Sequence, residues 1–135
     1  LLLILHVGYV FVPLGFILNA VAAFGELPPS AGIHAWMAGA AGTMTLAVMT
    51  RASLGHTGQA LTASPAVQAI YAAIVIAALA RIGAVVLPAY GDVLLYVAAC
   101  GWILAFLGFA VAFGPLLAGS GRRALATMGV PAPAR

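Results

Sequence analysis

SPAVQAIYAAIVIAALARIGAVVLP, residues 64–88, is the stretch that decides the fold of this chain. It contains a single charged residue, Arg81, and consists mainly of alanine, isoleucine and valine. Ser64 can cap the N-terminus of a helix, and Pro65 suits the first helical position. Because a helix needs about 20 apolar residues to cross a bilayer, the stretch predicts a transmembrane helix that begins at Pro65 and ends near Pro88.

The composition of the whole chain also indicates a membrane protein. Of 135 residues, 65% are hydrophobic and 5% are charged, whereas about a quarter of the residues in a soluble domain are charged. Residues 1–24, 31–50 and 92–118 are further apolar stretches that are long enough to cross a bilayer. We therefore predict an all-α fold, a polytopic bundle of four transmembrane helices over residues 1–118 within the lipid bilayer. A flexible cytoplasmic tail is expected over residues 119–135.

The charged residues predict the orientation of these spans. Arg51 follows the second span, and Arg122 and Arg123 follow the fourth, whereas Glu26 and Asp92 follow the first and third. Arginine is enriched in cytoplasmic loops, so we expect the loop after the second span and the C-terminus to face the cytoplasm. The arginines form no basic stripe with interleaved aromatic residues, so nucleic acid is not an expected partner.

The chain begins inside an apolar run, LLLILHV, which has neither the basic region nor the cleavage site of a signal peptide. We therefore expect the sequence to be the C-terminal portion of a longer membrane protein, with upstream helices that complete it. The single cysteine, Cys100, allows no disulfide within the chain and no CxxC metal motif.

Small residues recur along the second span. Ala35 and Gly39 are four residues apart, as are Ala38 and Gly42. Such pairs allow close approach of another helix, which is how helices pack within a membrane. The second span is therefore expected to lie at the centre of the bundle.

The three histidines are the candidate ligands for a metal or a haem iron. His34 lies inside the second span, where a polar side chain is costly, and its alternative role is an interfacial histidine bonded to a backbone carbonyl. His6 lies near the start of the first span, where Pro13 can bend the helix and open space for a cofactor. His56 lies in a glycine-rich segment that could equally be an ordinary loop. His34 and His56 are about 30 Å apart if the second span crosses the membrane, which argues against a shared metal.

Arg81 is the costliest residue within the predicted spans. It lies seven residues before Pro88, about 10 Å from that end of the helix. This depth places it in the same half of the membrane as His34. Its guanidinium must reach the surface, pair with Glu26 or Asp92, or bind an anion.

Residues 34–61, HAWMAGAAGTMTLAVMTRASLGHTGQAL, form the most specific pattern in the chain. In order along the chain they contain His34, Gly39, Gly42, Met44, the run Met49-Thr50-Arg51 and the run Ser53-Leu54-Gly55-His56-Thr57-Gly58. In this order they resemble the NnrS family of polytopic bacterial membrane proteins. The other spans are similar to that family in apolar character and in order.

The resemblance implies a haem- and copper-containing protein of the inner membrane of denitrifying and related bacteria. It also implies a role in the response to nitric oxide and nitrosative stress. On this basis His34, then His56 and His6, are the expected metal or haem ligands, and Arg81 is expected to pair with a haem propionate. Family members have several times as many spans, so upstream transmembrane helices of the same protein and nitric oxide are expected partners.

Two other classes of function fit the residues. In a transporter or channel fragment, Arg81 and Asn19 would line a polar path. In a structural subunit of a larger complex, the small residues of the second span would form the interface. Glu26 and Asp92 are the only acidic side chains, and hydrolase and phosphate-loop motifs are absent, so nothing in the sequence indicates hydrolytic chemistry. Whether the protein catalyses another reaction stays open at this point.

Overall fold

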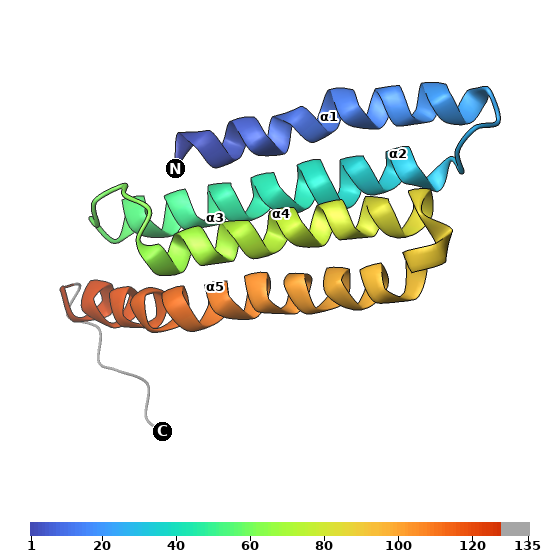
Figure 1. Ribbon diagram of the computed structural model, residues 1–135. Helices are drawn as coiled ribbons and strands as arrows, with labels where there is room; N and C mark the ends of the chain where they lie inside the picture. The colour runs from blue at the N-terminus through green and yellow to red at the C-terminus, as the bar shows by residue number, and fades with distance from the viewer. Residues whose placement is uncertain (128–135) are drawn as a thin grey trace.

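The computed structural model of this chain describes the backbone of residues 1–127 and the side chains of residues 1–119 (Figure 1). Its elements are α1 (Leu2–Ala23), α2 (Ser30–His34), the π-helix η1 (Ala35–Ala41), α3 (Gly42–His56), α4 (Pro65–Val86), the short 3-10 helix η2 (Pro88–Tyr90) and α5 (Gly91–Thr127). Over these residues the predicted all-α fold is confirmed.

The elements form a bundle of four helical rods that lie side by side and alternate in chain direction: α1, then α2 with η1 and α3, then α4, then α5 (Figure 1). One rod is continuous from α2 through η1 to α3, residues 30–56, and we call it the central rod. On one side the central rod contacts α1, and it also contacts α4 and, through α3, α5. The helix α5 packs mainly against α4. The expectation that the second span lies centrally agrees with this arrangement.

Three helices are long and apolar enough to cross a membrane: Leu2–Ala23, Pro65–Val86 and the helical stretch Pro88–Gly119. The start predicted for the second of these is confirmed, because the Ser64 hydroxyl accepts a hydrogen bond from the backbone N–H of Val67 at 3.3 Å. The fourth predicted span is not confirmed as a membrane-crossing helix. In the central rod the π-helix η1 separates the α-helices α2 and α3, so this rod contains no single α-helix of the required length, although it continues over residues 30–56.

The central rod ends later than the sequence predicted. Residues 51–56, which we expected to belong to a loop, form the last turns of α3. The helix stops at Thr57, whose hydroxyl donates to the carbonyl of Ser53 at 2.7 Å, and at Gly58, whose φ of 67° suits glycine. His56 is therefore the last helical residue and not a loop residue.

The helix α5 also continues beyond its predicted end at Ala118. Its backbone is helical to Thr127, so residues 119–127 of the predicted tail are helical. Alanine and arginine favour helix, and the next proline comes only at Pro131. The rest of the predicted tail, residues 128–135, lies outside the described residues.

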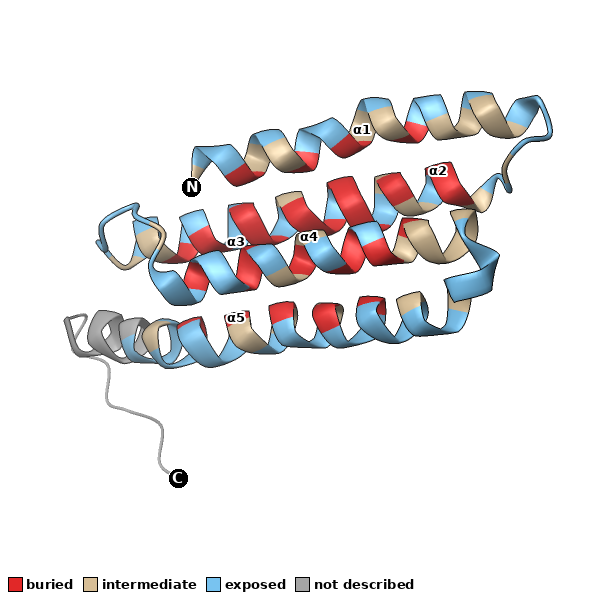
Figure 2. Ribbon diagram, in the orientation of Figure 1, coloured by how far each residue is buried: buried red, intermediate tan, exposed pale blue. Residues whose placement is uncertain are grey.

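Buried residues face the inside of the bundle (Figure 2), and apolar residues also cover its outside. Phe16, Leu104 and Val111, for example, are 63%, 64% and 69% exposed. A soluble protein rarely exposes such a continuous apolar surface. The outer surface therefore suits the acyl chains of a bilayer, in agreement with a membrane location.

Glycines bring α1 close to the central rod. A Cβ on Gly15 would meet the indole of Trp36, and a Cβ on Gly39 would meet the ring of Phe11. The Trp36 N–H donates to the backbone carbonyl of Val12 at 3.0 Å. The close approach predicted from the spacing of small residues in the second span is thus present at Gly39.

Candidate functional site

The π-helix η1 decides which side chains of the central rod face α4 and α5. Three positions at a four-residue spacing share that direction: His34 and Ala38 line a cavity with α4 and α5, and Gly42 lies against Trp102 of α5. In an α-helix of 3.6 residues per turn this spacing would drift around the rod. The wider turns of η1 compensate for this drift. Such π-segments are rare in proteins, and those that occur are often found at functional sites.

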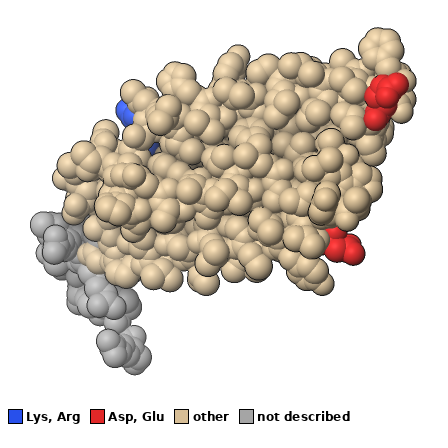
Figure 3. All heavy atoms as spheres, viewed as in Figure 1, with Lys and Arg blue, Asp and Glu red and all other residues tan. Residues whose placement is uncertain are grey.

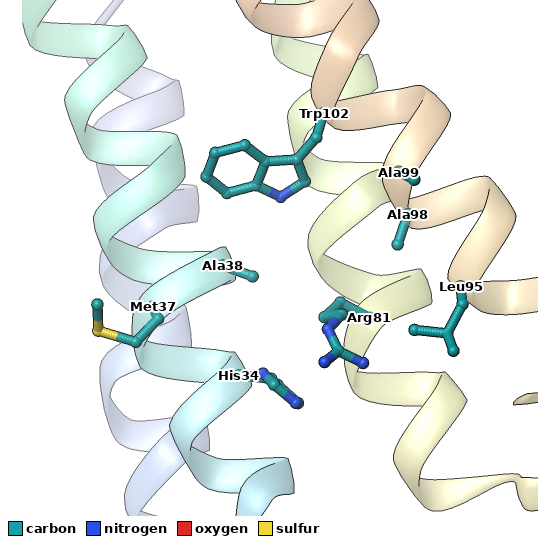
Figure 4. Close-up of a pocket in the computed structure, with 8 residues that line it drawn as sticks. All are labelled: His34, Met37, Ala38, Arg81, Leu95, Ala98, Ala99 and Trp102. Carbon is teal, nitrogen blue, oxygen red and sulfur yellow. The ribbon is translucent and has the colours of Figure 1, made fainter.

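A cavity of about 470 Å³ lies between the central rod, α4 and α5. It is lined by His34, Met37, Ala38, Arg81, Leu95, Ala98, Ala99 and Trp102. The imidazole of His34 and the guanidinium of Arg81 point toward each other across it, whereas the thioether of Met37 points away (Figure 4). The sequence placed His34 and Arg81 in the same half of the membrane, and the structure brings both into one cavity.

Arg81 carries a positive charge that the described residues do not neutralise. It is partly buried, and its guanidinium has no hydrogen bond or ion pair within residues 1–119. The two carboxylates of the chain, Glu26 and Asp92, are exposed and lie at one end of the molecule (Figure 3). Of the roles considered for Arg81, pairing with either carboxylate is therefore not observed. Surface contact and anion binding remain.

The other two histidines lie away from this cavity. His56 is exposed at the end of α3, and 22 residues separate it from His34 on the central rod, which is about 33 Å of helix. His6 is exposed on α1, where its Nδ1 bonds to the carbonyl oxygen of Leu2 at 2.9 Å. Its level is close to the middle of the central rod, because neighbouring Gly8 packs against Met44.

The structure thus places the three histidines at three different levels of the bundle. The described residues contain no group of three or more His, Cys, Asp or Glu side chains that could hold a metal ion. His34 is the one histidine that shares a cavity with another predicted site residue. A metal ion held by His34 would need further ligands from outside the described part of the chain.

Comparison with protein families decides the relationship that the sequence pattern indicated. The NnrS protein family model matches residues 1–120. The chain belongs to the NnrS family. No curated protein and no solved structure gives a significant match.

The family match covers almost all of the described chain. It therefore includes α1, α4 and α5 as well as the central rod, where the resemblance was strongest. The cavity between His34 and Arg81 lies wholly inside the matched residues. In this NnrS-family chain the cavity offers an imidazole with no hydrogen-bond partner among the described residues and an unpaired cation. Those two groups are chemically suited to a haem, which needs an axial ligand and cations near its propionates.

The sequence analysis missed three buried hydroxyl groups. Thr43 and Thr50 are 0% exposed and Tyr71 is 8% exposed. The hydroxyl of Thr43 has no hydrogen-bond partner in the described residues, whereas the hydroxyls of Thr50 and Tyr71 lie near each other without the geometry of a regular hydrogen bond. The available signal was the seven-residue spacing of the two threonines, which puts both on one helix face. None of the three lines the His34 cavity, so they are not part of the candidate site.

Proposed function

We propose that this chain belongs to a membrane protein that binds haem and copper and acts in the response to nitric oxide and nitrosative stress. Membership of the NnrS family supports the proposal. The single structural observation that carries it is the pairing of His34 with Arg81 in one intramembrane cavity. Haem and copper would supply the redox and ligand-binding chemistry that nitric oxide requires.

Within this proposal His34 is the first choice as haem ligand. The imidazole of His34 opens into the cavity, whose other lining residues are mostly apolar. Such a lining would limit the access of water to the bond between His34 and the haem iron. Arg81 would neutralise a carboxylate of the haem. His56 and His6 are proposed as ligands at other sites, because their levels in the bundle exclude a centre shared with His34.

The proposed location is the inner membrane of a bacterium, with the His56 end and the C-terminus in the cytoplasm. The lipid bilayer, upstream transmembrane helices of the same protein and nitric oxide are the proposed partners. The apolar outer surface supports contact of the bundle with lipid. The exposed position of His6 at mid-depth supports contact of this face of α1 with further helices, because a lipid-exposed polar side chain is costly there.

The test is a visible absorption spectrum and a metal analysis of the protein purified after haem-replete expression. We expect a Soret band and bound copper. His34→Ala should lose most of the haem, whereas Gln59→Ala, an exposed change beyond the end of α3, should keep it. His56→Ala and His6→Ala should each lower metal content without removing the haem held by His34.

Absence of both the Soret band and copper in the unaltered protein would contradict the proposal. A transporter fragment or a structural subunit would then be the better description. Unchanged haem content in His34→Ala would contradict the role of that residue alone.

A further inference from the structure

We propose that the cavity between the central rod, α4 and α5 is an anion-binding site in which Arg81 binds a carboxylate or a small oxyanion. If the carboxylate is a haem propionate, the inference rests on the proposed function; if it is a free small anion, it does not. The anion chemistry itself follows from the charge and the lining of the cavity.

The first argument is the uncompensated charge of Arg81. A partly buried guanidinium inside a membrane helix is costly unless an opposite charge accompanies it. No carboxylate of the described residues pairs with it, and both acidic side chains are exposed. An anion from outside this part of the chain would remove the cost.

The second argument is that the polar groups of the cavity are donors. Beside Arg81 stand the ring of His34 and the indole of Trp102, whose nitrogen lies on the edge nearer to them (Figure 4). The Trp102 N–H has no hydrogen-bond partner within the described residues. None of these three potential donors bonds to an acidic side chain of the described residues, and together they suit an acceptor that carries negative charge.

The third argument is the setting of these donors. The remaining lining residues are the side chains of Met37, Ala38, Leu95, Ala98 and Ala99. Apolar walls lower the local dielectric and strengthen the attraction between a guanidinium and an anion. A volume of about 470 Å³ falls within the usual range for ligand pockets. It can therefore admit either a free small anion or the carboxylate edge of a larger ligand.

Haem and its dimethyl ester distinguish these sources, because the ester keeps the macrocycle and lacks both carboxylates. Each is titrated into the haem-free full chain in detergent, and binding is followed by absorbance. For a propionate bound by Arg81 we expect the unaltered chain to bind haem about tenfold more tightly than the ester. Arg81→Gln should bind both alike, and Arg81→Lys should keep part of the preference.

The matched control is Arg51→Gln, which removes an exposed arginine near the opposite end of the central rod. This variant should keep the full preference for haem over the ester. If Arg81→Gln fails to fold, Arg81→Lys takes its place: a preference for haem over the ester that is reduced in Arg81→Lys and complete in Arg51→Gln supports the proposal.

Acetate tests the other source. If the cavity takes free small anions, sodium acetate should raise the unfolding temperature of the haem-free chain and of Arg51→Gln, but not that of Arg81→Gln. The proposal is overturned if haem and ester bind alike to the unaltered chain and acetate has no effect that depends on Arg81. If haem binds equally well to the unaltered chain and to Arg81→Gln, the proposed function still stands. If acetate stabilises the chain through Arg81 but haem does not bind at all, only the proposed function is contradicted.

Discussion

Trp36 shows how one side chain fixes the distance between two helices in this bundle. Its indole lies over Gly15 of α1, donates to the carbonyl of Val12 and meets the ring of Phe16 edge-on, with centroids 4.9 Å apart. Water is absent from the interior of a bilayer, so such shape matching and hydrogen bonding replace the hydrophobic effect between helices. The glycine is needed because no other residue leaves room for the ring.

Substitution of Gly15 tests this packing. In Gly15→Ala the added methyl group would collide with the indole of Trp36, so one helix must move. We expect a loss of about 1–3 kcal/mol in the free energy of unfolding, measured by denaturant titration in detergent. Gly55→Ala is the matched control, since its Cβ would meet nothing within 4 Å. It should be neutral or slightly stabilising within a helix, and equal losses in both variants would refute the packing argument.

At the scale of elements, the sequence predicted the helices and missed the π-turns. Apolar length together with Ser64 and Pro65 was enough to locate α4, because capping and chain stiffness are local properties. The π-helix Ala35–Ala41 has no such local signature. It depends on which faces of the central rod must meet α1, α4 and α5, and that is a property of the folded bundle.

For the candidate site, the sequence predicted the position of residues along each helix but not the direction in which their side chains point. Counting residues along helices placed His34 and Arg81 in the same half of the membrane, because rise per residue is nearly constant. It could not give their direction around the helix axis, which η1 changes. The separation of His34 from His56 along the central rod was predicted in the same way, from the number of residues between them and the rise per residue. The level of His6 was not, since it depends on the contact of Gly8 with the central rod.

Deletion of Ala41 tests whether η1 accommodates one extra residue in the central rod. Removing that residue should let the π-turn close to an α-helix, and the direction of His34 relative to α3 should be kept because the wider turns are lost together with the extra residue. Deletion of Val48, an exposed residue within α3, should instead rotate the residues before it by about 100° relative to the rest of α3. In a Cys100→Ser background, His34→Cys and Arg81→Cys should be joined by a short bifunctional thiol reagent, and this cross-link should survive the loss of Ala41 but not the loss of Val48. Loss of the cross-link after deletion of Ala41 would show that η1 does not act as a one-residue insertion.

At the scale of the whole molecule, the few charges are distributed unevenly along the bundle axis. Glu26 and Asp92 lie at one end (Figure 3), whereas Arg51 lies in the last turns of α3 toward the other. Because arginine favours the cytoplasmic side, the acidic end would face outward. The cavity of His34 and Arg81 would then lie in the outer half of the bundle, because His34 is close to the start of the central rod.

Cysteine labelling in intact bacterial cells tests this orientation. In a Cys100→Ser background, Glu26→Cys and Gln59→Cys each place one thiol in an exposed connection at opposite ends of the bundle. A membrane-impermeant maleimide should label Glu26→Cys in intact cells and should reach Gln59→Cys only after permeabilisation. The reverse pattern would invert the bundle and place the cavity in the cytoplasmic half. An anion would then reach Arg81 from inside the cell, so this measurement also decides from which side the ligand of the cavity must come.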